Sequence, residues 1–325
     1  MELSHPKDAL KDLLVATGLF VRSDYWAIAA YQGRSPLHLA PAAHAPVPVL
    51  GARDVTDADA EFVADPFMVP VPGAGWHLFF EVMNRATGRG EIAVAASSDG
   101  VTWTYGQVVL AEPHHLSYPQ VVACAGEHYM VPETSAERRV MLYRAVDYPT
   151  VWERAEDLLT GLPFNDATVF QHDGRWWMLA ETAEGLRFDT LRLYSADTLP
   201  GPWSEHPASP VVKGDPTTAR PAGRVVRHDG RLVRFAQDCA TDYGKRVRAF
   251  AIETLNASQY RERPLGTVLE PAEVGWNDQG MHQVDAHEVA PGQWLACVDG
   301  RPVPGLRRTP AARIPVRQRP RRHRR

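Results

Sequence analysis

The chain has few cysteines and lacks the apolar runs that membrane segments need. Its three cysteines, Cys124, Cys239 and Cys297, are widely spaced and fit no metal-ligand pattern, so we expect small buried residues rather than a disulfide framework or a zinc site. No uninterrupted apolar run approaches membrane-spanning length, and the N-terminal sequence MELSHPKDALKDLL is too charged for a signal peptide. We therefore expect a cytoplasmic protein with no membrane span.

Several short signatures of known chemistry are also missing. The chain has no phosphate-cradling glycine loop, no G-x-S-x-G elbow and no deaminase zinc signature. Basic residues are outnumbered before position 301. Residues 1–300 contain 25 Lys and Arg and 39 Asp and Glu, which gives this part of the chain a net charge of −14. This acidic body disfavours nucleic-acid binding.

The remaining basic residues gather at the C-terminal end. Residues 301–325 contain ten Arg, several Pro and no acid. Such a segment has too few large apolar residues to fold, so we expect a disordered Arg/Pro-rich tail over 301–325. Binding of nucleic acid or of an acidic partner is the alternative role for this tail.

Aromatic residues, proline and glycine are abundant. Trp (9), Tyr (10), Phe (10), Pro (27) and Gly (24) favour many short strands and turns over long helices. In the stretch NDATVFQHDGRWWMLAE, Ala167–Gln171 and Trp176–Ala180 have the composition of strands, and Asp173-Gly174 between them is a hairpin turn signal. Antiparallel pairing then brings Asp166 and Glu181 to the same end of the hairpin.

This hairpin is one of five similar units along the chain. Each unit runs from a residue that opens a strand to an acid that closes the next strand, with spacings of 16, 15, 15, 18 and 17 residues, and successive units start 53, 48, 54 and 62 residues apart. A period near fifty with three or four strands per unit predicts an all-β, five-bladed β-propeller over residues 25–300. A two-sheet β-sandwich is the alternative.

The ends of the chain complete this picture. The last unit is too short for a full blade, so we expect the early strand at Trp26–Ala30 to complete it and close the ring. Residues 1–24 form a separate N-terminal segment, with a weak helical period over 7–20. The Pro-rich stretch 35–50 is expected to be an irregular connection.

The hairpins place ten positions at one rim. They are Asp65, Tyr118, Asp166, Arg220 and His282 on inner strands, with Glu81, Glu133, Glu181, Asp238 and Asp299 on their partners. Six or more carboxylates in one pocket repel one another unless they are protonated, paired or bound, and Arg220 is a suitable counter-charge. Such a pocket suits a polyhydroxylated ligand, whose hydroxyls donate to carboxylates while aromatic rings cover its apolar face.

Several of these motifs carry a resemblance. The ADP at Ala64–Pro66 and the NDATVF and DGRWWM segments resemble the five-bladed propeller of glycoside hydrolase family 43 and its relatives. HLSYPQV, YMVPET, WWML, ARPAG and the VDAH and VDG segments are more closely similar to the propeller of plant glucosamine inositolphosphorylceramide transferases and of bacterial formyltransferase-like fusion proteins. The resemblance covers roughly residues 25–300 and implies carbohydrate chemistry.

In family 43 hydrolases one Asp is the general base, a second Asp tunes it and a Glu is the general acid. The resemblance assigns Asp65 to the base and Asp166 to the second Asp. Arg220, in Ala219–Gly223, stands where the proton donor is expected, and this departure questions simple hydrolysis. Glu133 is our candidate acid instead, because Pro132-Glu133-Thr134 interrupts an apolar strand at the rim.

The HQVDAH segment offers a further set of polar side chains. His282, Asp285 and His287 could ligate substrate, hydrogen-bond to one another or bind a metal. Strand alternation puts the two His on opposite faces, so we assign no metal and expect no cofactor, with an axial calcium as the alternative. We assign the following residues to substrate binding: Glu81, Tyr118, Glu181, Arg220, Asp238, His282, Asp285, His287 and Asp299.

These residues are consistent with two functions. The first is a glycoside hydrolase-like enzyme, with Asp65, Asp166 and Glu133 as the catalytic carboxylates, acting on a small glycoside or glycoconjugate. The second is a non-catalytic carbohydrate-recognition module that serves a partner glycosyltransferase or formyltransferase. Arg220 favours the second function, and the complete acidic rim favours the first.

Overall fold

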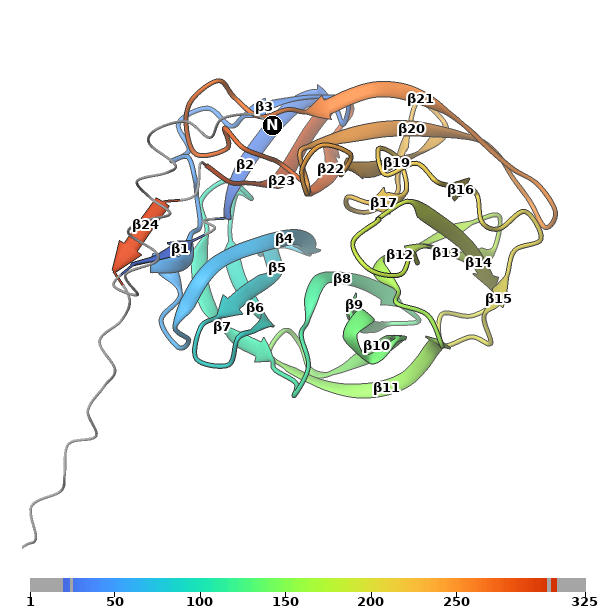
Figure 1. Cartoon of the computed structure of the whole chain (residues 1–325), viewed down its shortest axis with the longest axis horizontal. Coiled ribbons are helices and arrows are strands. Elements are labelled where there is room, and N and C mark those ends of the chain that lie inside the picture. Colours follow the sequence, from blue (N-terminus) through green and yellow to red (C-terminus); the bar gives the residue numbers. More distant parts are fainter. Residues whose placement is uncertain (1–19, 24–25, 303–304, 309–325) are drawn as a thin grey trace, which may run out of the picture. The chain divides into compact units, whose positions relative to one another are not determined.

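The structure, a computed structural model, describes residues 20–23, 26–302 and 305–308. Residues Asp24–Val303 form one compact unit, in which five antiparallel sheets are arranged around a common centre (Figure 1). The described residues contain no α-helix, and only two short 3-10 turns, Ala52–Asp54 and Ser135–Glu137, interrupt the strands. The all-β, five-bladed β-propeller is therefore confirmed.

Four of the blades are built from consecutive strands. The first contains β4 (Ala60–Val71), β5 (Gly75–Asn84), β6 (Arg89–Ser97) and β7 (Thr104–Leu110), and the second β8 (Ser117–Cys124), β9 (Glu127–Glu133), β10 (Arg139–Asp147) and β11 (Val151–Thr160). The third contains β12 (Asn165–His172), β13 (Arg175–Glu181), β14 (Thr190–Ala196), β15 (Ser204–Glu205) and β16 (Val212–Lys213). The fourth contains β17 (Arg220–Pro221), β18 (Val226–His228), β19 (Arg231–Asp238), β20 (Arg246–Leu255) and β21 (Tyr260–Leu269).

The fifth blade joins the two ends of the propeller. It consists of β22 (Val284–Ala290), β23 (Gln293–Gly300), β2 (Ala27–Ser35) and β3 (His38–Pro41), and Ala27 to Gly33 pair with Gly300 to Trp294. Closure of the ring by an N-terminal strand is confirmed. The expected irregular connection at 35–50 was wrong for His38–Pro41, which forms the outer strand β3 by pairing with β2.

The central hairpin forms as its sequence predicts. Asn165 pairs with Glu181 and His172 with Arg175, so the chain reverses at Asp173-Gly174. Both turn residues have positive φ, 48° and 74°, which suits the two-residue turns that match strand twist. The hairpin therefore carries Asp166 and Glu181 to one end of the blade.

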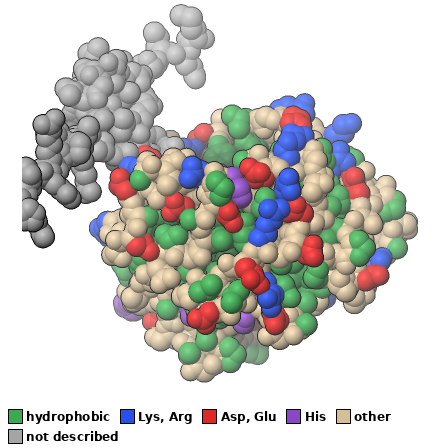
Figure 2. Space-filling model, turned by 90° about the horizontal axis from the view of Figure 1, so that it is seen from below, with side chains coloured by type: hydrophobic (Ala, Val, Ile, Leu, Met, Phe, Trp, Pro, Cys, Tyr) green, Lys and Arg blue, Asp and Glu red, His purple; other side chains and the backbone are tan. Residues whose placement is uncertain are grey.

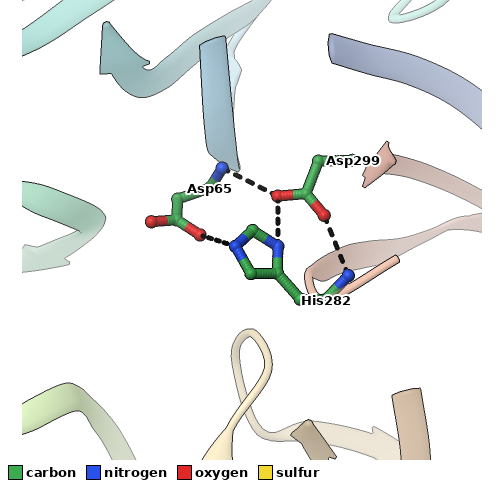
Figure 3. A group of neighbouring side chains, drawn as sticks. All are labelled: Asp65, His282 and Asp299. Carbon is green, nitrogen blue, oxygen red and sulfur yellow. Dashed lines mark hydrogen bonds and ion pairs between the residues drawn. The ribbon is translucent and has the colours of Figure 1, made fainter. Parts of the chain in front are cut away.

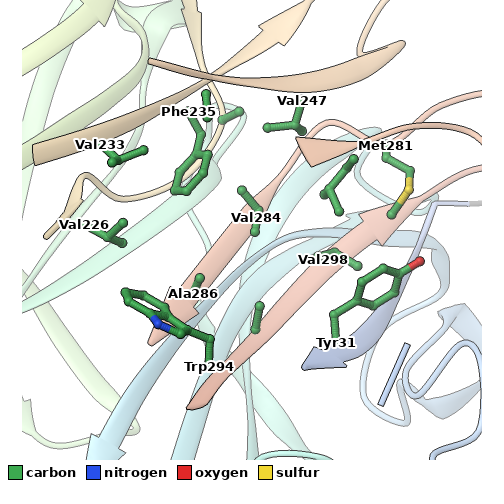
Figure 4. Packing of buried hydrophobic residues seen from close by; sticks show 14 of the residues in the cluster. Tyr31, Val226, Val233, Phe235, Val247, Met281, Val284, Ala286, Trp294 and Val298 are labelled. Atoms are coloured by element: carbon green, nitrogen blue, oxygen red, sulfur yellow. The ribbon is translucent and has the colours of Figure 1, made fainter. Parts of the chain in front are cut away.

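The hydrophobic core lies between neighbouring blades. Each of five buried clusters combines apolar residues of two adjacent sheets, for example Val233 and Phe235 of blade four with Val284 and Trp294 of blade five (Figure 4). Sheets that are apolar on both faces must be covered on both, and a closed ring achieves this while leaving few free edges. Cys297 is buried in this core, and all three cysteines are free thiols.

Acidic and basic side chains are mixed on the side of the molecule seen in Figure 2. Among the exposed ion pairs, Arg144 contacts both Glu127 and Glu153, and Arg175 contacts Asp197. Surface pairs of this kind contribute little stability but neutralise the basic residues of the body. Among the described residues, no helix has the length and apolarity that a membrane span requires.

A second unit contains the described residues outside the propeller. In it β1 (Phe20–Ser23) and β24 (Gly305–Arg308) pair antiparallel with each other. Four residues of the segment that we expected to be disordered, Gly305–Arg308, thus form a strand. Arg301, also from that segment, belongs to the propeller unit and contacts Asp242 within it. The weak helical period over 7–20 lies almost wholly outside the described residues, as does the tail beyond residue 308.

Candidate functional site

Three inner strands carry the same irregularity where they reach the mouth of the propeller. In β4, β8 and β12 the register gains one residue against the partner strand, and Asp65, Tyr118 and Asp166 have φ of 54°, 48° and 51° at that point. Positive φ is unfavourable for residues with a side chain, so the surrounding contacts must hold these bulges. Each bulge turns one side chain out of the normal alternation.

A carboxylate of an adjacent blade accepts the amide hydrogen of each bulged residue and so stabilises the three bulges. Asp299 Oδ2 accepts a hydrogen bond from the Asp65 amide at 3.0 Å, and Asp65 Oδ2 accepts from the Tyr118 amide at 3.1 Å. Glu133 Oε2 accepts from the Asp166 amide, also at 3.1 Å. Each of these contacts crosses between two blades, so the acids at the mouth also tie the ring together.

Arg220 is the cation among these acids. Its Nε lies 2.6 Å from Asp166 Oδ2, and its Nη2 lies 3.3 Å from Glu133 Oε2. The rings of Phe188 and Tyr243 lie 4.8 and 5.1 Å from its guanidinium carbon, so aromatic faces cover the charge. The structure thus places Arg220 as the counter-charge of two predicted catalytic residues.

His282 lies between two aspartates at the mouth (Figure 3). Its Nδ1 is 2.7 Å from Asp299 Oδ2, its Nε2 is 3.6 Å from Asp65 Oδ1, and its ring stacks on Trp26 at 3.9 Å. Burial lowers the pKa of His282, but Asp299 and Asp65 outweigh it, so the net shift is upward.

These three residues are the one described group of His and acids compact enough for a metal, with ligand atoms within 4.8 Å. However, Asp299 already accepts hydrogen bonds from the amides of Asp65, His282 and Gln283. Few of its lone pairs remain for a cation, so the geometry suits an oriented imidazole better than a ligand set. The axial calcium stays a prediction.

The buried carboxyl groups of the mouth have raised pKa values. Burial, with Asp166 and Asp299 nearby, raises the pKa of Asp65 to about 7, although His282 and Arg220 act against it. Burial and Glu133 raise the pKa of Asp166 to about 7 against the opposing effect of Arg220. Burial and four neighbouring acids raise the pKa of Glu81 well above its usual range. At pH 7 the mouth therefore carries fewer negative charges than its number of acids suggests.

A cavity of about 540 Å³ opens at this mouth. Of the predicted residues, five line it, namely Asp65, Glu81, Glu133, Arg220 and His282, and Asp166, Tyr118 and Asp299 lie buried behind them. The cavity is also lined by residues that the sequence analysis did not assign to the site: Trp26, Phe62, Ser117, Ser135, Asn165, Leu186, Phe188, Tyr243 and His115. Ser117 and Asn165 directly precede Tyr118 and Asp166, so their positions in the sequence could have placed them at the site. No feature of the sequence indicated that the loop residues Leu186, Phe188 and Tyr243 line the cavity.

Four predicted binding residues, Glu181, Asp238, Asp285 and His287, do not line the cavity. Glu181 and Asp238 interact with groups close to their own strands. Glu181 is fully buried and accepts hydrogen bonds from Asn165 Nδ2 and from the amides of Ala183 and Thr190. Asp238 Oδ2 lies 2.6 Å from Arg248 Nη2. Neither residue lines the cavity.

Asp285 and His287 belong to a different cluster. Asp285 is fully buried, forms an ion pair with Arg224, accepts a hydrogen bond from the Met68 amide at 2.6 Å and lies 3.0 Å from His287 Nε2. Burial alone would raise the pKa of Asp285, but Arg224 and His287 lower it below its usual value. The HQVDAH segment therefore divides, with His282 at the mouth and Asp285 and His287 elsewhere.

Comparison with known proteins identifies relatives of the whole propeller. The family model described as "Glucosamine inositolphosphorylceramide transferase 1, N-terminal" matches residues 22–301. Glucosamine inositolphosphorylceramide transferase 1 of Oryza sativa subsp. japonica is 38% identical over 301 residues, covering 86% of this chain and 40% of the relative. The protein of that name from Arabidopsis thaliana is 33% identical over 297 residues, with 85% and 39% covered.

The chain therefore spans about 40% of the length of these relatives. Among solved structures, a thermostable family-43 glycoside hydrolase superposes with a TM-score of 0.50 at 13% identity, covering 64% of this chain and 76% of that one. This likeness shows a shared propeller fold. The resemblances to the family 43 propeller and to the plant transferase propeller are confirmed.

Proposed function

Because this chain belongs to the glucosamine inositolphosphorylceramide transferase 1 N-terminal family, we propose that its propeller is a carbohydrate-recognition domain. In this proposal the mouth binds the sugar part of a glycoconjugate and breaks no bond. The transfer reaction named for the relatives would belong to the part of those proteins that this chain does not span. The observation that carries the proposal is the double ion pair of Arg220 with Asp166 and Glu133.

Glycosidic cleavage needs one carboxylic acid that donates a proton and one carboxylate that acts as base or nucleophile. Glu133 Oε2 already accepts from Arg220 and the Asp166 amide, and its Oε1 accepts from Ser135 Oγ at 3.1 Å. These three hydrogen bonds leave Glu133 one lone pair, on Oε1, for a transferable proton.

Asp166 is occupied in the same way. Its Oδ2 accepts from Arg220 Nε at 2.6 Å and from Gln237 Nε2 at 2.7 Å, and its Oδ1 accepts from Arg220 Nη2 at 3.3 Å. Two of the three carboxylates that a hydrolase mechanism would use are thus already hydrogen-bonded to Arg220 and to other groups of the propeller. Sugar binding does not require these two carboxylates to transfer a proton, because it needs only the shape and polarity that they give the cavity.

The cavity has the character of a sugar site. The polar residues Asp65, Glu81 and His115 line it together with the aromatic residues Trp26 and Phe188. Sugar rings present hydroxyls at their edge and an apolar face, which suits this combination, and small-molecule pockets commonly measure about 300–1,000 Å³. The surplus of acids over cations disfavours a phosphate group, so we expect an uncharged or amine-bearing sugar unit.

Calorimetric titration of the chain with a panel of methyl glycosides tests the recognition role. The panel contains methyl glycosides of glucose, galactose, mannose, glucosamine and N-acetylglucosamine, together with free myo-inositol. We expect saturable binding of at least one member without turnover. Binding should weaken at least tenfold in Phe188→Ala and stay unchanged in the control Val289→Ala, whose exposed side chain lies outside the cavity. No saturable binding by any member would contradict the proposal.

Glycosidic-bond cleavage is the second candidate, and Asp65 favours it. Asp65 lines the cavity, its Oδ1 lies 3.6 Å from His282 Nε2, and its raised pKa suits proton transfer near neutral pH. Aryl glycosides distinguish the two functions. Release of the aryl group that is lost in Asp65→Asn would establish catalysis, and its absence alongside sugar binding would support recognition.

A further inference from the structure

A second cavity, of about 370 Å³, lies at the other end of the inner strands, and we call it the distal cavity. Strand β4 lines the mouth with Asp65 and the distal cavity with Pro70, and β12 lines them with Asn165 and Gln171. Each residue advances a strand by about 3.3 Å, so the two openings lie apart along the axis. Between them the Tyr118 side chain is fully buried, and the two openings are therefore separate cavities.

The two cavities differ in the charge of their walls. The mouth is lined by three acids, Asp65, Glu81 and Glu133, whereas no described residue that lines the distal cavity is an acid. Cationic side chains and amide groups in a cavity without carboxylates attract anions. The polar residues that line the distal cavity are Gln120, His128, Gln171, Arg224 and Arg227.

Arg224 is held in a fixed orientation with one nitrogen unused. Its Nε and Nη2 donate to Asp285, and Nη2 also donates to the Met68 carbonyl oxygen at 3.0 Å. No described residue accepts a hydrogen bond from Nη1, and this atom is not buried. The Arg224 side chain is 19% exposed and lines the distal cavity, so a ligand there can accept from Nη1. A guanidinium that is already oriented loses little freedom when it binds a ligand.

Arg227 supplies the positive charge that no acid balances. The charge of Arg224 is offset by Asp285, whose side chain is fully buried. Arg227 is exposed, lines the distal cavity and forms no ion pair with an acid in the described part of the chain. Gln171 is also exposed there and adds amide N–H groups that can donate. An anion in the cavity therefore meets one unbalanced charge and donors from three side chains.

The remaining walls of the distal cavity are apolar and come from four blades. Apolar walls exclude water and so strengthen the attraction between an arginine and an anion. They can also cover a hydrocarbon or aromatic group attached to that anion, which an inorganic ion would not provide. The apolar residues include Val69, Val121, Val169, Phe170, Trp176 and Leu232.

We infer that the distal cavity binds a small organic anion, a carboxylate or phosphate ester with an apolar body, through Arg224, Arg227 and Gln171. One ligand oxygen accepts from Arg224 Nη1 and another from the Arg227 guanidinium, since arginine suits the oxygens of carboxylates and phosphates. The apolar body packs against the valine and aromatic side chains of the walls. The inference does not depend on the proposed sugar-binding function, because the two cavities share no lining residue.

The first test titrates the chain calorimetrically with phenyl phosphate, benzoate, inorganic phosphate and benzyl alcohol. We expect saturable binding of phenyl phosphate or benzoate, at least fivefold tighter than that of inorganic phosphate, and no saturable binding of the uncharged alcohol. Inorganic phosphate that binds as tightly as phenyl phosphate would overturn the assignment to organic anions.

Variants locate the site. Arg224→Met would leave the buried Asp285 without its counter-charge and endanger folding, so the exposed residues are changed instead. Arg227→Gln, and Gln171→Glu, which adds an acid to the cavity, should each weaken binding at least tenfold. The matched control Arg231→Gln removes an exposed arginine of the same hairpin that does not line the distal cavity, and it should change binding less than twofold. Undiminished binding by both cavity variants would overturn the site.

The second test uses the parent chain alone. Phenylglyoxal modifies accessible arginines, and mass spectrometry of peptides gives the rate at each of them. Saturating phenyl phosphate should slow the modification of Arg227 at least fivefold and leave that of Arg231 unchanged. Equal rates at Arg227 with and without the anion, or no binding of either organic anion, would overturn the inference and leave the proposed sugar-binding function untouched.

Discussion

Asp299 accepts a hydrogen bond from the backbone amide of Asp65 across 3.0 Å, although 234 positions separate the two residues in the chain. The same carboxylate accepts from the amides of His282 and Gln283. The last blade therefore holds the first blade at the mouth through one side chain. Ring closure and the shape of the candidate site depend on the same group.

Replacing Asp299 with Ala should destabilise the chain strongly. The change leaves three buried backbone amides without their acceptor, and hydrogen bonds to charged groups contribute about 1.5–3 kcal/mol each. We expect a loss of at least about 3 kcal/mol in the free energy of unfolding, measured by urea denaturation. Asp197→Ala, which removes an exposed partner of Arg175, should change it by less than about 1 kcal/mol.

Replacing Arg220 with Met should leave Asp166 and Glu133 without their buried counter-charge. Breaking one side of a buried ion pair typically costs about 3–5 kcal/mol, and a loss of that order is expected in urea denaturation. Arg220→Lys keeps the charge but not the planar fork that reaches both acids, so its loss should be intermediate. Equal stability of the parent and both variants would show that the ion pairs do not hold the mouth.

Stability should fall as pH rises from about 5 to 8. The pKa of Asp65 is about 7 in the folded chain and near 3.8 when unfolded, so in this range the folded state binds more protons than the unfolded state. The raised pKa of His282 acts in the same direction, because its contribution is lost as pH rises through the folded value. Thermal unfolding in this range should show a smaller slope for Asp65→Asn than for the parent chain, and an unchanged slope would count against a protonated Asp65.

Removing the hydroxyl group of Tyr118 should weaken the contacts between blades at the centre of the propeller. The Tyr118 hydroxyl accepts a hydrogen bond from the Gly223 amide at 2.7 Å and lies 2.8 Å from Thr168 Oγ1, so it joins blades two, three and four. Tyr118→Phe leaves the buried Gly223 amide unpaired, at a cost of about 1–3 kcal/mol. Hydrogen exchange at Gly223 should accelerate, whereas Tyr129→Phe on the neighbouring strand β9 should leave it unchanged.

Much of the fold could be predicted from local sequence. The hairpin of β12 and β13 depends on strand-forming residues and on the Asp173-Gly174 turn, all within one short segment. The repeat of such hairpins, together with a strand at Trp26–Ala30 that had no partner nearby, was enough to predict a closed ring. Interactions within a hairpin are close in sequence, so composition and spacing report them directly.

The choice of which acids face the cavity was beyond the sequence. Glu181 and Glu81 occupy corresponding hairpin positions, yet Glu181 is engaged by groups close to its own hairpin, whereas Glu81 keeps an oxygen without a partner beside His115. Asp285 is turned toward Arg224 and Met68, which belong to other blades.

The hairpins, their ends and the closing strand at Trp26–Ala30 were thus determined by the sequence alone, because turns and alternation act over a few residues. The bulges at Asp65, Tyr118 and Asp166, and the partners that hold them, were decided only when the blades packed around the axis. One added residue in a strand reverses the direction of a side chain, and only contacts between blades stabilise that reversal.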